Sequence, residues 1–107
     1  MSVYANTSLA RVPDNAGGSV RVTIDDNAGQ GNDGDSLPCK EVLIVADDGN
    51  SGDVRVNTGS ACTASNGFPV PKFGTNHFVL RIATDDVSNL YFYGSNDTDV
   101  VDILYRR

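Results

Sequence analysis

Short apolar runs recur from residue 19 to residue 105, and clusters of Gly, Asn, Asp or Ser separate them. In the first run the side chains of Val20, Val22 and Ile24 alternate with polar ones. A period of two residues is typical of a strand with one buried face. No window of useful length has the i, i+3, i+4 spacing of an amphipathic helix. The pattern therefore predicts an all-β fold.

Five further runs are predicted to be strands, at 40–46, 53–58, 78–83, 90–93 and 100–105. The run at 40–46 holds consecutive apolar residues instead of alternating, which indicates a central strand covered on both faces. We expect 40–46 to form an antiparallel hairpin with 53–58, and 90–93 to form another with 100–105. Six to eight strands favour a single compact antiparallel β-sandwich or a jelly-roll-like barrel.

Residues 1–18 are expected to form an extended N-terminal arm, and residues 19–107 the β-sandwich domain. The arm has no helical period and ends in a turn signal at 15–18. Residues 25–36 contain no apolar side chain larger than Ala, so we expect a solvent loop there. A second loop is expected around Phe68-Pro69-Val70-Pro71, and a single helical turn could form at 84–89.

Length and charge exclude several classes of function. With 107 residues, of which 39% are hydrophobic, the chain can form one core. The net charge is −6 and no segment concentrates Lys or Arg, so we expect no nucleic-acid binding. The longest apolar run, 42–46, is far shorter than the roughly 20 residues that span a bilayer. We expect a chain that has no membrane partner and is made in the cytoplasm.

Candidates for catalysis and metal binding are few. The single histidine, His77, lies in a predicted loop, and we interpret it as an ordinary polar residue. One histidine and two distant cysteines do not give the ligand spacing of a zinc site. The sequence therefore predicts no enzyme activity and no cofactor.

Acidic loops at 25–35 and 47–53 contain the oxygen ligands that calcium prefers. Neither loop fits the EF-hand pattern, because counting from Asp48 the sixth position is Asp53 instead of Gly and the twelfth is Gly59 instead of Glu. Solvated turns are the simpler interpretation, and calcium binding stays open.

The two cysteines allow an argument from the expected hairpin. Pairing of 40–46 with 53–58 would place Cys39 one to three positions from Cys62. At about 3.3 Å per residue, this offset is close to the limit of about 7 Å between the Cα atoms of a disulfide. A disulfide and two buried or half-buried free thiols are both compatible with the sequence.

Tyr91 and Tyr93 are expected on the strand face opposite Leu90 and Phe92. Exposed tyrosines on one face could stack on sugars or anchor a protein interface, where Tyr is enriched. Ordinary cover of the sheet is the third interpretation, and the sequence leaves all three open.

The stretch from Leu37 to Tyr105 resembles a small β-sandwich module of structural proteins in tailed-bacteriophage virions. The similarity lies in LPCKEVLI at 37–44, NSGDVRVN at 50–57, NGFPV at 66–70, TDDVSNLYFYGS at 84–95 and VVDILY at 100–105. It covers about two thirds of the chain and does not extend to residues 1–36.

This resemblance implies a virion structural protein without enzymatic activity, of the capsid decoration (cement) or fibre type. The expected partner is the major capsid protein, and binding near symmetry axes would favour a homotrimer on the capsid exterior. Met1, Val3, Tyr4 and Leu9 are too few to form their own core, so we expect them to contact the capsid or a neighbouring subunit. The alternatives are a tail, fibre or head-spike component in host attachment, and a free-standing carbohydrate-binding module that uses Tyr91 or Tyr93.

Overall fold

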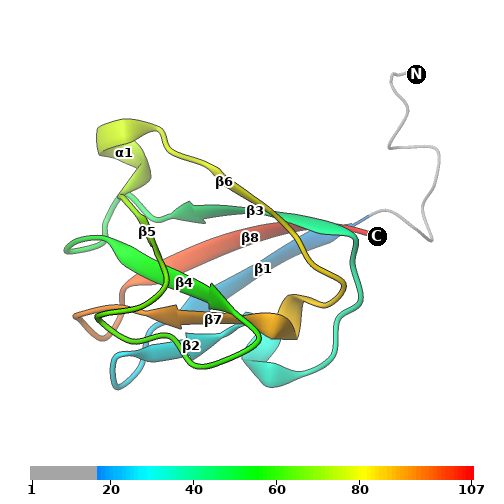
Figure 1. The fold of residues 1–107 in the computed structure, drawn as a ribbon. Helices are drawn as coiled ribbons and strands as arrows, with labels where there is room; N and C mark the ends of the chain where they lie inside the picture. Colours follow the sequence, from blue (N-terminus) through cyan, green and yellow to red (C-terminus); the bar gives the residue numbers. More distant parts are fainter. Residues whose placement is uncertain (1–16) are drawn as a thin grey trace.

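Two four-stranded antiparallel sheets face each other in the computed structural model, which describes residues 17–107 (Figure 1). Sheet A has the strand order β1 (Gly18–Thr23), β8 (Val100–Arg106), β3 (Glu41–Ala46) and β6 (Leu80–Ala83). Sheet B has the order β2 (Ala28–Gln30), β7 (Leu90–Tyr93), β4 (Val54–Thr58) and β5 (Phe68–Val70). The prediction of an all-β chain with six to eight antiparallel strands is confirmed.

The core lies between the two sheets. Strand pairing aligns Val22 with Val101 and Ile103 with Ile44, so that the alternating apolar side chains of sheet A face inward together. The inward side chains of sheet B meet them, and Phe92 is the largest fully buried residue. The period of two read from residues 19–24 therefore gives the correct buried face for β1.

The strand pairs are nested. β1 pairs with β8, β2 with β7, β3 with β6, and β4 with β5, as in one long hairpin whose tip lies between β4 and β5. Two further pairs, β3 with β8 and β4 with β7, complete the sheets. Because of this nesting, every connection except the one between β4 and β5 passes from one sheet to the other.

Both predicted hairpins are wrong. β3 pairs with β6 and β8, whereas β4 lies in the other sheet, and β7 and β8 are separated in the same way. The connections at 47–53 and 94–99 are arches between sheets, which we call the β3–β4 arch and the β7–β8 arch. Gly, Asn and Asp permit both kinds of chain reversal, so local turn composition does not distinguish a hairpin from an arch.

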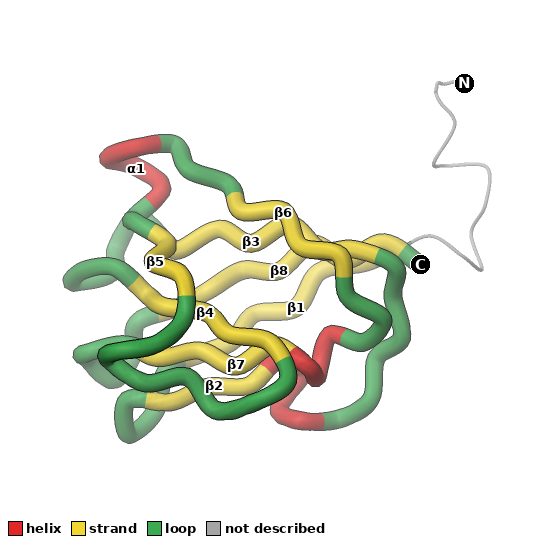
Figure 2. The backbone as a smooth tube through the Cα atoms, in the orientation of Figure 1, coloured by secondary structure: helices red, strands yellow, loops and turns green. Residues whose placement is uncertain are grey.

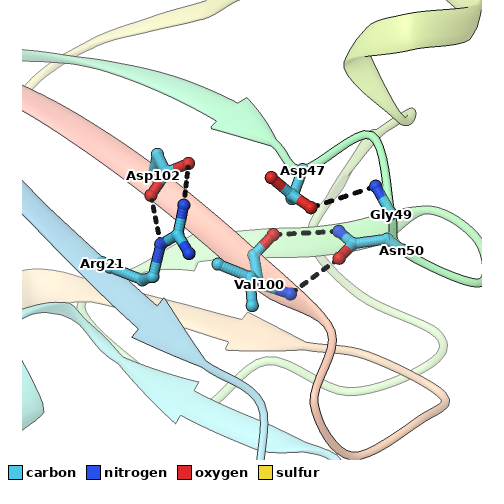
Figure 3. A network of polar contacts seen from close by, with 6 residues as sticks. All are labelled: Arg21, Asp47, Gly49, Asn50, Val100 and Asp102. Atoms are coloured by element: carbon cyan, nitrogen blue, oxygen red, sulfur yellow. Dashed lines mark hydrogen bonds and ion pairs between the residues drawn. The ribbon is translucent and has the colours of Figure 1, made fainter.

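Buried polar side chains join the two arches (Figure 3). The side-chain amide of Asn50 donates to the carbonyl of Val100 at 2.9 Å, and its oxygen accepts from the Val100 N–H at 2.7 Å. Ser51 donates its backbone N–H and its hydroxyl to the carboxylate of Asp99. Asn50 and Asp99 are each only 4% exposed, so these bonds satisfy polar groups that water does not reach.

The predicted solvent loop at 25–36 is also wrong, because it contains β2 and a 3-10 turn at Gly31–Gly34. A Cβ at Gly29 would lie 2.8 Å from Val22 Cγ1, and one at Gly31 would lie 2.0 Å from the Val87 carbonyl oxygen. Glycine thus allows backbone to pack directly on the neighbouring strand and turn. Hydrophobic periodicity does not detect a strand that packs through its backbone.

Two other differences concern sheet edges. Phe68–Val70, predicted as loop, forms β5, an edge strand that accommodates Pro69 because one side of its backbone needs no partner. β3 is an interior strand as predicted, but among the described residues only its inner face is covered, and Leu43 and Val45 remain half-buried on the outer face.

Helical structure in the described residues is limited to short turns outside the sheets (Figure 2). The α-helix α1 (Phe73–Asn76) joins β5 to β6, and a 3-10 turn at Val87–Asn89 precedes β7, within the segment where a single turn was predicted. No helix in this part of the chain is long and apolar enough to cross a membrane.

Candidate functional site

An apolar opening lies where β5 and β6 form neighbouring edges of the two sheets. β5 pairs only with β4 and β6 only with β3, so among the described strands nothing closes this side by hydrogen bonding. The rings of Phe68 and Phe78 stack across the opening with centroids 6.1 Å apart. We call this opening the β5–β6 seam, and its apolar members are Val56, Phe68, Phe78, Leu80 and Ile82.

The seam forms a groove of about 420 Å³ in which Phe68 is 50% exposed. Phe78, Leu80 and Ile82 are partly buried and pack against the core. Exposed aromatic side chains beside a partly open core are typical of protein interaction sites. Sequence reasoning missed this site because it assigned Phe68 and Pro69 to a loop, and a proline is tolerated in an edge strand without indicating one.

A second apolar surface lies on the outer face of sheet A. Leu43 and Leu104 are paired across β3 and β8 and point away from the core, because their neighbours Val42, Ile44 and Ile103 are fully buried. Leu104 is 55% exposed. The groove beside them, of about 400 Å³, is here called the sheet A groove, and it is lined by Gly17, Gly18, Glu41, Val42, Leu43, Leu104, Tyr105 and Arg106.

Ion pairs lie around the sheet A groove. Glu41 accepts from Arg106 and from Arg81 at 2.9 and 2.8 Å. Hydrogen bonds from Arg106 and then Arg81 lower the pKa of Glu41. On the same face Arg21 forms a two-bond contact with Asp102 (Figure 3). The charged groups nearest the two leucines are therefore already paired, which leaves the leucines as the free contact surface.

Tyr91 and Tyr93 lie on the outer face of sheet B, opposite Leu90 and Phe92 as predicted, and both are half-buried. Strand pairing places Asn57 beside Tyr91 and Arg55 beside Tyr93. The polar side chains of this face bond backbone carbonyls of the domain: Arg55 donates to Asn66 and Gly67, and Asn57 to Ser60. Their donors are largely used within the fold.

Asp86, at the start of the turn before β7, joins this turn to residues 36–37. Its carboxylate accepts from the backbone N–H of Leu37 and of Ser88, and from the hydroxyls of Ser36 and Ser88. These bonds, with the Leu37 N–H as the largest contribution, hold the pKa of Asp86 well below its ordinary value. Asp86 therefore caps the turn before β7 and ties it to residues 36–37, since every donor comes from the domain itself.

The possible disulfide between Cys39 and Cys62 is not formed. Both are free, buried thiols, and burial raises the pKa of each. Cys39 bonds the Thr84 carbonyl, whereas Cys62 lies against Gly67 beside β4. The expected proximity depended on the hairpin between β3 and β4, and the arch instead places these strands in different sheets.

His77 is an exposed residue that ends α1 in a left-handed conformation. Its backbone N–H donates to the Phe73 carbonyl, and its ring meets the Phe73 ring edge to face at 5.2 Å. In the part of the chain that the structure describes, no group of three or more His, Cys, Asp or Glu side chains converges as a metal site would require.

Met1, Val3, Tyr4 and Leu9, predicted to contact a capsid or a neighbouring subunit, lie outside the described residues. Their role stays a prediction. No family model, curated protein or solved structure matches the chain.

Proposed function

We propose that this chain is a structural protein of a bacteriophage virion, and that it decorates the capsid by binding the major capsid protein. The nested strand pairs support this proposal, because eight strands paired in this order across two sheets correspond to a double-sheet jelly roll. Jelly rolls occur in viral capsid proteins and also in lectins and cupins, so the fold alone does not select the function.

The observation that carries the proposal is the β5–β6 seam. At the two arches the core is closed by buried, hydrogen-bonded polar groups, and on the opposite side the edge strands β1 and β2 are joined by a tight turn bonded between Asp25 and Ala28. The seam instead exposes Phe68 beside its stacked partner Phe78. An aromatic side chain with apolar surroundings is a typical anchor at the centre of a protein interface. An edge strand such as β5 also offers unpaired backbone groups to a neighbouring protein.

The mechanism is binding linkage. A protein that binds the assembled shell and not its separated subunits lowers the free energy of the assembled state. In this proposal the seam binds the major capsid protein. Contacts with a capsid neighbour are added by Met1, Val3, Tyr4 and Leu9, and three copies assemble around a symmetry axis. The chain would act from the capsid exterior without catalysing a reaction.

The direct test is sedimentation of the purified chain with shells assembled from the major capsid protein alone. We expect saturable binding and shells that resist heat and low salt better with the chain than without it. The Phe68→Ala variant should bind at least about tenfold more weakly, which corresponds to ~1.4 kcal/mol. Leu104→Ala, a similarly exposed apolar residue outside the seam, is the matched control and should bind no more weakly than the unmodified chain.

Absence of binding, or binding that leaves shell resistance unchanged, would contradict the decoration role. Location of the chain only at the tail or at a unique vertex in a reconstructed particle would instead support a tail, fibre or head-spike component. Equal loss of binding in both variants would show that the seam is not the specific contact.

A free-standing carbohydrate-binding module is the second candidate, because Tyr91 and Tyr93 lie together on one face of sheet B. The neighbouring Arg55 and Asn57 already bond carbonyls of the domain, so part of the donor capacity that could read sugar hydroxyls is used within the fold. A glycan array decides between the two: a response that Tyr91→Ala and Tyr93→Ala remove would favour the module.

A further inference from the structure

The turn before β5 contains Asn66, the one asparagine in the printed sequence that is followed by glycine. In an Asn-Gly step the backbone nitrogen of the glycine can attack the side-chain amide carbon of the asparagine, because glycine has no Cβ to hinder the approach. The attack closes a succinimide ring, which water then opens. Asn66 is exposed, so water reaches the amide that would react.

The fold requires glycine at position 67. Gly67 has a φ of +85°, in the left-handed region that favours glycine. A Cβ there would lie 2.6 Å from Cys62 Sγ and 2.8 Å from the Val56 carbonyl oxygen. A larger residue that would slow the attack is therefore excluded by the packing of this turn against β4.

Arg55 donates to both carbonyls of this step. Its Nε bonds the Asn66 carbonyl at 3.0 Å, and its second nitrogen bonds the Gly67 carbonyl at 3.0 Å. The Asn66 carbonyl belongs to the same peptide group as the Gly67 nitrogen. A cationic donor on this oxygen stabilises the anion that forms when the Gly67 nitrogen loses its proton. Arg55 is therefore placed to make that nitrogen a better nucleophile.

A second donor lies on the side chain that would be attacked. The backbone N–H of Thr63 donates to Oδ1 of Asn66 at 2.7 Å, and negative charge develops on this oxygen when the amide carbon becomes tetrahedral. Nδ2, the leaving nitrogen, has a contact of 3.4 Å with the Ala61 carbonyl, which is long for a hydrogen bond. Asn50 differs in both respects, because it is 4% exposed and both ends of its amide bond Val100.

We propose that Asn66-Gly67 is a self-modification site, at which the folded chain converts Asn66 to aspartate or isoaspartate with Arg55 and the Thr63 N–H as its donors. The Gly67 nitrogen loses its proton and bonds Cγ of Asn66, the bond between Cγ and Nδ2 breaks, and Nδ2 leaves with a proton as ammonia. Water then adds to one of the two ring carbonyls and breaks its bond to the nitrogen. Water is the sole co-reactant, and nothing is oxidised or reduced.

The product changes the start of β5. In isoaspartate the main chain runs through Cβ and Cγ, which lengthens it by one carbon and moves the carbonyl that Arg55 holds. The next residue after Gly67 is Phe68, which pairs with Val56 of β4. The modification should therefore loosen the pair of β4 and β5 beside the seam. The reaction belongs to the chain alone and does not depend on the proposed function.

The test is incubation of the full-length chain at neutral pH, followed by digestion and mass spectrometry of the peptide that contains residue 66. We expect the native chain to react at least as fast as the same chain denatured in urea. Arg55→Met should slow the native reaction about tenfold, the effect of losing one charge-assisted hydrogen bond, and should leave the denatured rate unchanged. Arg21→Met removes another arginine with a two-bond contact, to Asp102, and is the matched control that should change neither rate.

A native rate below the denatured rate would overturn the proposal, and this comparison needs no variant, so it decides even if Arg55→Met fails to fold. Equal native rates in the unmodified chain and Arg55→Met, or equal slowing in Arg55→Met and Arg21→Met, would also overturn it. In the isoaspartate fraction, hydrogen exchange should be faster in β4 and β5 than in the unmodified chain. Unchanged exchange there would remove the effect assigned to the product.

Discussion

The two arches and the β5–β6 seam close the same sandwich in opposite ways. At the arches, Asn50 and Asp99 are polar and almost fully buried; Asn50 bonds the backbone of Val100 at the start of β8, and Asp99 accepts from the backbone N–H of Ser51 in the facing arch. At the seam, Phe68 is apolar and half exposed, and β5 and β6 do not pair. At the arches the buried side chains of Asn50 and Asp99 are bonded within the chain itself, whereas the seam leaves apolar surface available. This difference suggests which part holds the fold together and which part meets a partner.

The largest effect on stability is expected at the arches. Asn50→Ala removes both bonds to Val100 and leaves a backbone N–H without its acceptor, which should cost ~2–3 kcal/mol in the free energy of unfolding. Asn96→Ala, in the exposed part of the β7–β8 arch, is the control and should change stability by less than about 0.5 kcal/mol. Equal losses in the two variants, measured by urea denaturation, would remove the special role given to Asn50.

A smaller and pH-dependent effect is expected at Asp86, a polar tether at another connection. Because its folded-state pKa lies below the ordinary value of 3.8, the carboxylate stabilises the fold above about pH 4 and loses this effect as pH falls through the folded value. Asp86→Ala should therefore lower the Tm at neutral pH, and the difference from the unmodified chain should shrink in strong acid. Asp35→Ala is the control and should leave the Tm at neutral pH nearly unchanged, since its side chain is exposed and bonds none of the described residues.

Phe68→Ala should change stability by under ~1 kcal/mol, little for a large apolar residue, because the side chain is already half in water. The same variant should show the large loss of shell binding described above. The same urea denaturation measures the loss. If it were comparable to that of Asn50→Ala, the seam would be part of the essential core, and the arches and the seam would not differ in their contribution to stability.

The smallest effect concerns the thiols. Cys39 and Cys62 should react slowly with a thiol reagent in the folded chain and completely after denaturation, since both are buried with a raised pKa. The reagent should count two thiols per denatured chain even after mild oxidation. Loss of both thiols together on oxidation would indicate that a disulfide joins the two sheets.

Much of the fold follows from local pattern. β1, β3, β4, β7 and β8 appear within one residue of their predicted bounds, because alternation and apolar runs identify strands independently of their partners. Which strands pair with each other does not follow from local pattern. Whether a Gly, Asn and Asp turn forms a hairpin or an arch depends on bonds such as that of Asn50 to Val100, fifty residues away in sequence, which no local window contains.

The missed site has a similar explanation. β2 packs through Gly29, and β5 contains Pro69, so neither resembles a strand by composition. The seam forms only because β5 and β6 become neighbouring edges of separate sheets. The apolar outer face of β3 follows from the non-alternating run at 42–45, in which Leu43 and Val45 face outward and are half-buried.

Hydrogen–deuterium exchange of the chain, free and bound to shells of the major capsid protein, tests the central claim most directly. In the free chain the amides of Asn50 and Val100 should exchange slowly and those of β5 quickly. On the shell, new protection should appear in Phe68–Val70 and Leu80–Ala83, with little change at the arches. Protection confined to the sheet B face around Tyr91 and Tyr93, or no new protection in the bound chain, would contradict the account.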